Sequence, residues 1–171
     1  FQTIDAYRNL EGITHLEFNY PEHVDGYDLD EIREHMGGLG VNGVALRFRG
    51  NEFAEGEFTG TREDVSRRSV QLCKDAADAC EALGGSVITI WLGFDGFDYP
   101  FQVDYEKNWD KIVRAFREVA DYAGGKGLKV SIEYKPCEPR AFSMIDGIGL
   151  TLQMIDEVDR PNIGVTLDAI C

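Results

Sequence analysis

The sequence predicts an α/β fold, a (β/α)8 TIM barrel that is incomplete here and contains about strands 2 to 6 with their helices. Strand-like and helix-like segments alternate along the chain, no Gly-rich phosphate-binding turn follows a strand, and polar residues recur with a period of two within the strands. A doubly wound sheet has helices on both faces, so charged residues inside its strands would be costly, whereas one face of each barrel strand lines the lumen. We therefore expect one partial barrel domain over residues 1–171.

The expected elements are short and are separated by joints marked by Gly or Pro. The strands cover residues 14–19, 41–49, 86–94, 129–135 and 163–168. The helices cover residues 3–10, 28–37, 61–83, 108–124 and 143–158, and the fourth of them shows the clearest apolar stripe. Asp28 and Asn108 stand where a helix needs an N-cap, and Gly84 can adopt the left-handed conformation that ends a helix.

Polar side chains follow one face of every expected strand and gather toward its C-terminal end, because successive side chains point to opposite faces. The polar faces carry His15, Glu17 and Asn19; Arg47 and Arg49; Thr89, Trp91 and Asp95; Ser131, Glu133 and Lys135; and Thr166 and Asp168. Active sites of barrels lie at the C-terminal ends of the strands, so we expect these residues to converge on one site. The alternative is that single members only pack, for example Glu17 and Arg47 as a buried ion pair without chemistry.

Glu133 and Asp168 form the most informative pair in this pattern. They are 35 positions apart, one βα unit, and would lie at the ends of adjacent strands beside Lys135. Two buried carboxylates repel each other unless a proton or a cation lies between them, and a hard divalent cation suits carboxylate oxygens. The residues therefore predict a metal site at Glu133 and Asp168.

Composition excludes several classes of partner. The net charge of −14 repels phosphate backbones, so we expect no nucleic-acid partner, and no apolar run approaches the ~20 residues that span a bilayer, so we expect no membrane partner. The four cysteines lack zinc-site spacing, and free thiols point to the cytoplasm. Because the chain starts at Phe1 and has too few strands for a closed barrel, we expect it to be an excerpt of a longer protein or its ordered part.

Several motifs resemble those of the xylose isomerase-like barrel superfamily. The segment from Ser131 to Arg140, SIEYKPCEPR, resembles its I-E-x-K-P-x-E-P-R motif, and IGVTLD, ending at Asp168, resembles the strand that follows. The run from Trp91 to Phe101 and the run HLEFNYP from His15 are similar to segments of its sugar isomerase and epimerase branch. The resemblance covers nearly the whole chain.

The resemblance implies one divalent ion, with Mn²⁺ as first choice and Mg²⁺, Co²⁺ and Zn²⁺ as alternatives. Glu133 and Asp168 match the first two ligands; the other two, a His and a carboxylate, belong to strands that lie beyond this chain. Lys135 matches a position that contacts substrate oxygen in xylose isomerases. Many members have a His three residues after the metal-binding Asp, whereas this chain has Cys171, which puts one sugar contact in doubt.

The implied function is a metal-dependent sugar isomerase or epimerase that abstracts a proton next to a sugar carbonyl. Glu133 and Lys135 are the expected catalytic residues. The expected substrate-binding residues are His15, Glu17, Asn19, Arg47, Trp91, Asp95 and Asp98. For Trp91 the alternative is a core position, and for Asp95 and Asp98 it is a solvated loop or turn.

Two other functions remain open at this point. One is a C-glycoside deglycosidase subunit, a lyase of the same superfamily that eliminates an aglycone from a 3-oxo-sugar; the other is a scaffold or binding module without catalysis. The endonuclease relatives of the fold are disfavoured, because they use three zinc ions and many histidines and this chain has three histidines and a strongly negative charge. The expected partners are a small sugar or glycoside and either further copies of the chain or a partner subunit.

Overall fold

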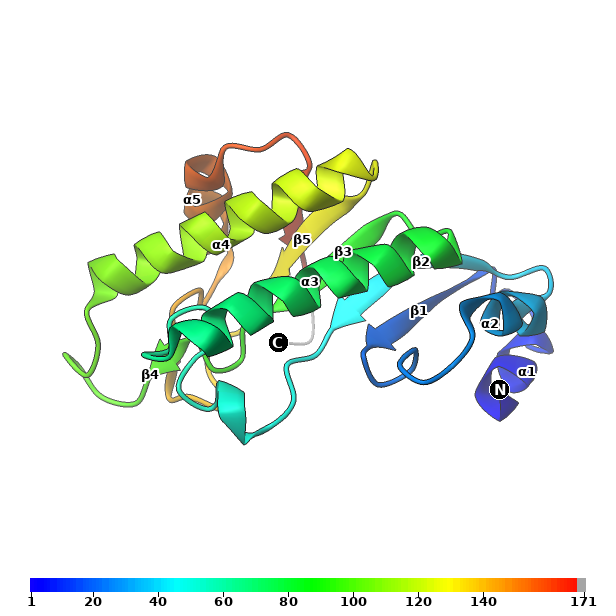
Figure 1. Ribbon diagram of the computed structural model, residues 1–171, viewed down its shortest axis with the longest axis horizontal. Helices are drawn as coiled ribbons and strands as arrows, with labels where there is room; N and C mark the ends of the chain where they lie inside the picture. Colours follow the sequence, from blue (N-terminus) through cyan, green and yellow to red (C-terminus); the bar gives the residue numbers. More distant parts are fainter. Residues whose placement is uncertain (169–171) are drawn as a thin grey trace.

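The computed structural model describes residues 1–168, which form a parallel sheet of five strands (Figure 1). Its order is β1-β2-β3-β5-β7, the order of the strands along the chain. The strands are β1 (His15–Tyr20), β2 (Gly40–Leu46), β3 (Val87–Trp91), β5 (Lys129–Glu133) and β7 (Ile163–Thr166). Cys171, where the resemblance expects a His, lies outside the described residues.

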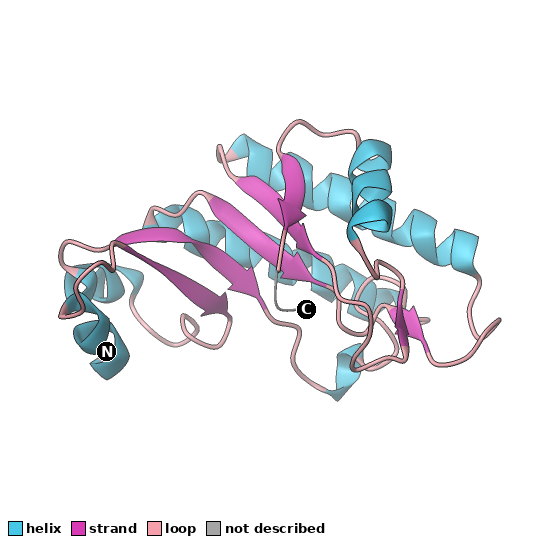
Figure 2. Cartoon of the chain, turned by 180° about the vertical axis from the view of Figure 1, so that it is seen from behind, coloured by secondary structure: helices cyan, strands magenta, loops and turns pink. Residues whose placement is uncertain are grey.

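The helices are α1 (Gln2–Arg8), α2 (Leu29–Met36), α3 (Glu63–Leu83), α4 (Tyr105–Gly125) and α5 (Ile148–Val158). Helices α2 to α5 connect the strands and cover one face of the sheet, and α1 precedes β1 and packs against α2. Figure 2 shows the other face, on which the strands lie in front of the helices. A sheet in chain order with helices on one side is part of a (β/α)8 barrel and not a doubly wound fold, as the sequence predicts. None of the helices in residues 1–168 is long and apolar enough to cross a membrane.

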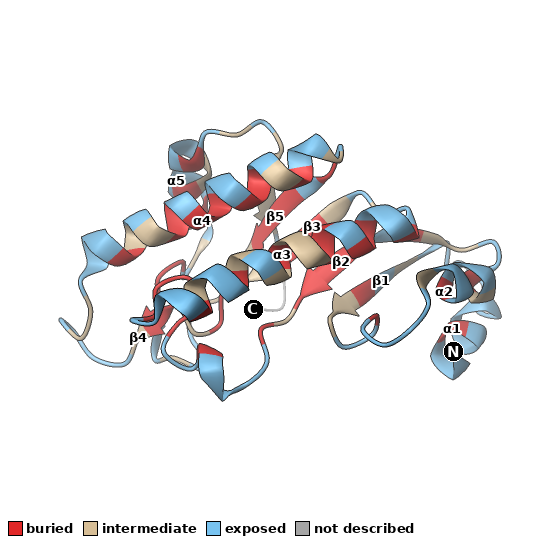
Figure 3. Cartoon of the chain, in the orientation of Figure 1, coloured by how far each residue is buried: buried red, intermediate tan, exposed pale blue. Residues whose placement is uncertain are grey.

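The core lies between the helices and the covered face of the sheet. Ile88, Ile90 and Phe116 have no exposed surface, and Ile132 has 1%. On α3 and α4 the residues facing the sheet are buried while those facing outward are exposed, which gives the red and blue stripes of Figure 3. Removal of this apolar surface from water is the main force that holds the layers together.

The register of the strands places the polar residues on the opposite, open face. Ile90 pairs with Leu46 and with Ile132, all of them in the core. One position further, Trp91 pairs with Glu133, and Glu133 pairs with Thr166. Because side chains alternate along a strand, these residues share the face away from the helices.

Several boundaries differ from the prediction. Helix α4 begins at Tyr105, and its N-cap is Asp104, whose carboxylate accepts a hydrogen bond from the Lys107 N–H at 3.1 Å. The prediction of Asn108 as the cap was wrong, because that residue lies buried inside the first turns of the helix. The cap at Asp28 is confirmed by its 2.9 Å hydrogen bond with the Asp30 N–H, and Gly84 ends α3 with a left-handed φ of 79°.

Short elements in the loops were not predicted. They are η1 (Asn51–Phe53), β4 (Gly96–Phe97) and β6 (Phe142–Ser143), and β4 pairs with β6 in antiparallel fashion. Residues 143–147 belong to β6 and the turn after it, so α5 starts later than expected. These loops follow β2, β3 and β5 and therefore surround the C-terminal ends of those strands.

Candidate functional site

A cavity lies where the sequence predicts a site, at the C-terminal ends of the strands. Its volume is about 460 Å³. It is lined by Arg47, Phe48, Arg49, Glu57, Trp91, Gly93, Phe94, Lys135, Glu138 and Pro139. We call this the mouth cavity. It brings together the predicted residues Arg47, Trp91 and Lys135, which belong to successive strands or the segments directly after them.

Each of these side chains is positioned by its strand. Arg47 continues β2 and donates its backbone N–H to the Tyr20 carbonyl at 2.8 Å, so it stays aligned with the sheet. Trp91 is the last residue of β3, and Lys135 lies two residues after Glu133, on the same face. The Lys135 Nζ atom lies 5.0 Å from the centre of the Trp91 ring, within the range of a cation–π interaction.

The polar atoms around Lys135 and Trp91 are incompletely paired. Lys135 forms an ion pair with Glu138 at 3.6 Å, but the Glu138 side chain is 79% exposed, so the pair is weak. The Nε1 atom of Trp91 is buried and finds no hydrogen-bond partner among residues 1–168. A buried N–H without a partner costs free energy and requires an explanation.

Glu57 is a residue of the mouth cavity that the sequence analysis missed. Only 1% of it is exposed, and both oxygens of its carboxylate lie 3.0 Å from the Phe94 N–H, which donates to them. Burial and then the charge of Asp95 raise the pKa of Glu57 well above its usual 4.5. Glu57 lies in a loop outside any periodic pattern, so strand alternation could not point to it.

Asp95 is hydrogen-bonded to the loop of residues 57–60, to which Glu57 belongs. Its carboxylate accepts hydrogen bonds from the backbone N–H groups of Phe58 (3.0 Å) and Thr59 (2.9 Å) and from the Thr59 hydroxyl (2.6 Å). A Cβ atom at Gly56 would come within 2.8 Å of this carboxylate, and Gly56 has a φ of 118°, so the loop requires glycine there. Burial raises the pKa of Asp95 above its usual 3.8, although the Thr59 and Phe58 hydrogen bonds oppose the rise.

The environment of Asp95 contradicts one of the two sequence interpretations, the solvated loop residue. Asp95 is 1% exposed, so it is not a solvated loop residue, and its oxygens already accept hydrogen bonds from the loop of residues 57–60. Its observed contacts fix the wall of the mouth cavity. They leave a sugar contact as an untested expectation.

Asp98 lies further out and binds a different partner. The Arg140 guanidinium donates to its carboxylate at 2.7 Å and to the Ala54 carbonyl at 2.8 Å. The Ala141 N–H, followed by the Arg140 guanidinium, lowers the pKa of Asp98 below its usual 3.8. Arg140 thereby joins the loops after β2, β3 and β5 into one rim.

The predicted site residues of β1, which are His15, Glu17 and Asn19, do not line the mouth cavity. His15 is the first residue of β1, pairs with Gly40 and contacts the Thr14 hydroxyl at 3.0 Å, so it lies at the opposite end of the sheet from the mouth cavity. Glu17 lines a different hollow, of about 350 Å³, beside α1. Asn19 pairs with Ala45, one layer below Arg47. The structure therefore does not bring His15 or Glu17 to the mouth cavity.

Glu133 and Asp168 supply the donors that a divalent cation would need. Glu133 is half-buried and pairs with Thr166, and the Ser131 hydroxyl is hydrogen-bonded to the Thr166 hydroxyl on the same open face. Asp168 follows two residues later, beyond the end of β7, and we expect it on that face if the alternation continues past the strand. Two carboxylates on adjacent strands fit a hard cation as part of a larger ligand set. Within residues 1–168 no group of three or more His, Cys, Asp or Glu residues forms a complete metal site.

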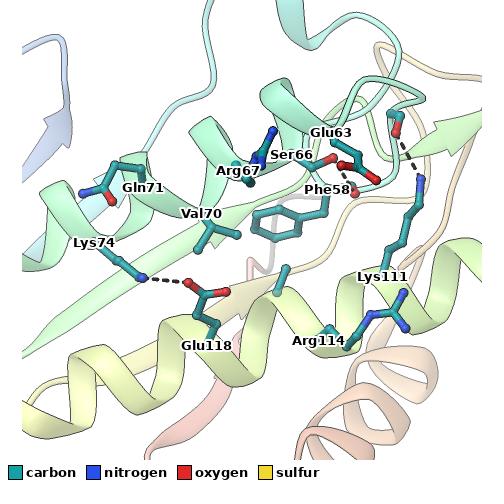
Figure 4. A pocket seen from close by; sticks show the side chains of 12 residues that line it. Phe58, Glu63, Ser66, Arg67, Val70, Gln71, Lys74, Lys111, Arg114 and Glu118 are labelled. Carbon is teal, nitrogen blue, oxygen red and sulfur yellow. Dashed lines mark hydrogen bonds and ion pairs between the residues drawn. The ribbon is translucent and has the colours of Figure 1, made fainter.

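A second hollow, of about 480 Å³, lies between α3 and α4 on the helix-covered side (Figure 4). Some of its charged groups are paired: Lys74 contacts Glu118 at 2.7 Å, and Lys111 donates to the carbonyls of Thr59 (2.9 Å) and Gly60 (3.0 Å). Lys111 thus supports the loop of residues 57–60 from behind. The hollow lies on the far side of the sheet from Glu133, so we do not regard it as the active site.

Comparison with known proteins agrees with this geometry. Residues 5–170 match the model of the family described as xylose isomerase-like TIM barrel. The match covers nearly the whole chain and confirms the predicted incomplete barrel.

Solved structures show the same fold. A D-allulose 3-epimerase from Methylomonas sp. in complex with D-allulose is 26% identical with a TM-score of 0.72, over 93% of this chain and 52% of that one. A D-psicose 3-epimerase from Clostridium cellulolyticum H10 with D-tagatose is 19% identical with a TM-score of 0.75, over 96% and 56%. The IOLI protein with a bound zinc atom is 17% identical with a TM-score of 0.69, over 91% and 53%. The chain spans about half the length of these structures.

Proposed function

Because the chain belongs to the xylose isomerase-like TIM-barrel family, we propose that it forms part of a divalent-metal-dependent sugar isomerase or epimerase. The observation that carries the proposal is the mouth cavity, in which Arg47, Trp91 and Lys135 meet at the strand ends beside Glu133. The similarity to an epimerase that binds D-allulose supports a ketose as the substrate.

In this proposal each residue has a distinct role. Glu133 takes the proton from the carbon next to the sugar carbonyl, and Lys135 donates hydrogen bonds to the oxygen on which negative charge develops. Trp91 packs against the apolar face of the sugar ring or chain. The loops tied by Glu57, Asp95 and Arg140 keep these groups in place, which is what positioning catalysis requires.

The cation would be held by Glu133 and Asp168 together with ligands from outside this chain. When bound, it supplies Lewis-acid stabilisation of the sugar oxygens; Mn²⁺ is our first choice, and Mg²⁺, Co²⁺ and Zn²⁺ are the alternatives. The bound zinc of a structural relative supports a divalent ion in this fold. The proposal also places the protein in the cytoplasm and in an assembly with further copies or a partner subunit.

Deuterium exchange tests the proposed reaction. The full-length protein is incubated with Mn²⁺ and D-fructose or D-allulose in D₂O, and NMR follows deuterium entry at the carbon next to the carbonyl. We expect exchange that falls at least about 100-fold in Lys135→Met, because an oxyanion donor is lost. Lys129→Met is the control: Lys129 is exposed at the other end of β5, so exchange should be unchanged.

The outcomes separate the possible functions. Exchange with an epimerised or isomerised ketose supports the proposal. Release of an aglycone from a 3-oxo-C-glycoside, without exchange into ketoses, would favour the lyase. Absence of both reactions, in protein that binds Mn²⁺, would contradict the proposal and favour a binding module.

A further inference from the structure

The mouth cavity is more cationic than the protein around it. Among its lining residues in the described part of the chain, Arg47, Arg49 and Lys135 are cationic, and Glu57 and Glu138 are acidic. The chain as a whole carries a net charge of −14. In a protein with this strongly negative charge, a local excess of cations raises the question of which anionic groups pair with them.

Among the three cations that line the mouth cavity, Arg47 has no side-chain partner within residues 1–168. Arg49 forms an ion pair with Glu22 at 2.8 Å, and Lys135 is shared between Glu138 and the Trp91 ring. Arg47 is half-buried, yet no hydrogen bond or ion pair joins its guanidinium to any of residues 1–168. Partial removal of a guanidinium from water without a partner is unfavourable, so a ligand that pairs with it gains free energy.

Trp91 adds a second unpaired donor on the same side of the cavity. Its Nε1–H is buried and lacks an acceptor within the described residues. Arg47 follows Leu46, which pairs with Ile90, so Arg47 and Trp91 occupy the same layer of the sheet. Both groups donate hydrogen bonds and neither can accept one, so the ligand atoms that satisfy them must be acceptors, which in a sugar are oxygens.

Glu57 does not neutralise this side of the cavity. Its carboxylate is turned toward the Phe94 N–H, and burial next to Asp95 raises its pKa, which favours the uncharged form. Glu57 therefore does not cancel the charge of Arg47.

We propose that the sugar bound in the mouth cavity carries an anionic oxygen group, a carboxylate or a phosphate, which the Arg47 guanidinium and the Trp91 indole N–H bind. This inference rests on the proposed function and names its substrate class. The planar fork of a guanidinium matches two oxygens of either anion, and the indole N–H is a further donor in the same layer of the sheet. A neutral ketose offers the guanidinium no anionic group.

Calorimetry with the full-length, Mn²⁺-loaded protein tests the proposal. The probes are D-fructose, D-fructuronate and D-fructose 6-phosphate, which share the keto-sugar part and differ in the terminal group. We expect one of the two anionic sugars to bind at least about tenfold more tightly than D-fructose, and the tighter of the two identifies the anion. That preference should weaken as NaCl rises from 50 to 500 mM, while D-fructose binding should not change.

Variants assign the effect to the two residues. Arg47→Met should abolish the preference for the anionic sugar over D-fructose. Trp91→Phe keeps an aromatic ring but removes the N–H, and should reduce the preference about three- to tenfold. Arg114→Met is the matched control, because it removes the same charge from the exposed, helix-covered side and should keep the preference.

The failures of the two proposals are distinguishable. Equal or tighter binding of D-fructose, or a preference that survives in Arg47→Met, would overturn the anionic substrate alone. Arg47-dependent binding of an anionic sugar without deuterium exchange would support the inference and contradict the isomerase. Absence of binding by all of the sugars in correctly folded protein would overturn both.

Discussion

The two faces of the same strands differ in chemistry from one residue to the next. On β3, Ile88 and Ile90 point toward the helices and have no exposed surface, whereas Thr89 and Trp91 alternate with them on the opposite face, and Trp91 lines the mouth cavity. On β5, Ile132 is core and Glu133, its neighbour, is a proposed metal ligand. Stability and function therefore depend on alternate residues, and substitutions on the two faces should act on different measurements.

The largest effect on stability is expected on the helix-covered face. Ile132→Ala removes a fully packed side chain and leaves a cavity, so the free energy of unfolding should fall by about 2–5 kcal/mol. Ser131→Ala, the preceding residue on the open face, loses only its hydrogen bond to Thr166 and should cost less than about 1.5 kcal/mol. Urea unfolding followed by circular dichroism measures both, and equal costs would contradict the assignment of the faces.

The two acids of the loop after β3 should also differ. Asp95→Asn replaces an acceptor of buried N–H groups and should lower the free energy of unfolding by about 2–3 kcal/mol. Asp98→Asn should have a smaller effect, because the Asp98 side chain is 43% exposed and its ion pair with Arg140 is partly screened. Thermal unfolding would detect the difference; a larger effect for Asp98 would mean that the rim depends on Arg140 more than on the buried loop.

The raised pKa of Glu57 predicts that the free energy of unfolding depends on pH. The pKa of Glu57 is raised above 4.5 in the folded state, so folding takes up a proton. The free energy of unfolding of the wild-type protein, relative to that of Glu57→Gln, is therefore greatest near pH 4.5. This advantage is lost as the pH rises through the pKa of the folded state. The loss is at most about 1.4 kcal/mol per pH unit. Urea unfolding of both proteins from pH 4.5 to 8 measures it, and a difference that is constant with pH would show that Glu57 is ionised when folded.

The smallest effect is expected in the hollow between α3 and α4. Lys74→Met breaks an ion pair with Glu118, whose side chain is 58% exposed, and should change the free energy of unfolding by less than about 0.5–1 kcal/mol. Deuterium exchange into a ketose should be unaffected. A loss of exchange in Lys74→Met would connect this outer hollow to the mouth cavity.

The sequence predicted what depends on local periodicity. Alternation within strands identified the open face with Trp91, Glu133 and Lys135, because side-chain direction along a strand is set by the backbone. The spacing of apolar residues predicted that the helices exist, but it did not predict where α4 begins. Asp104 and Asn108 are both chemically suitable N-caps, and tertiary packing decides between them.

What the sequence could not predict are contacts between loops. Glu57 and Asp95 each bind backbone N–H groups of the other's loop, and such contacts between residues 37 or 36 positions apart leave no periodic signal. The same holds for Asp98, whose partner Arg140 comes from the loop after β5. His15 continued the polar pattern of its strand, yet its place at the N-terminal start of β1 takes it away from the cavity.

Binding of Mn²⁺ by the full-length protein tests the central claim that Glu133 and Asp168 hold a cation at the open face. In a titration followed by electron paramagnetic resonance, the wild-type protein and the control Glu118→Gln should bind one Mn²⁺ per chain with equal affinity. Glu133→Gln should bind at least about 100-fold more weakly, because a charged ligand is lost. Unchanged binding in Glu133→Gln would contradict the account.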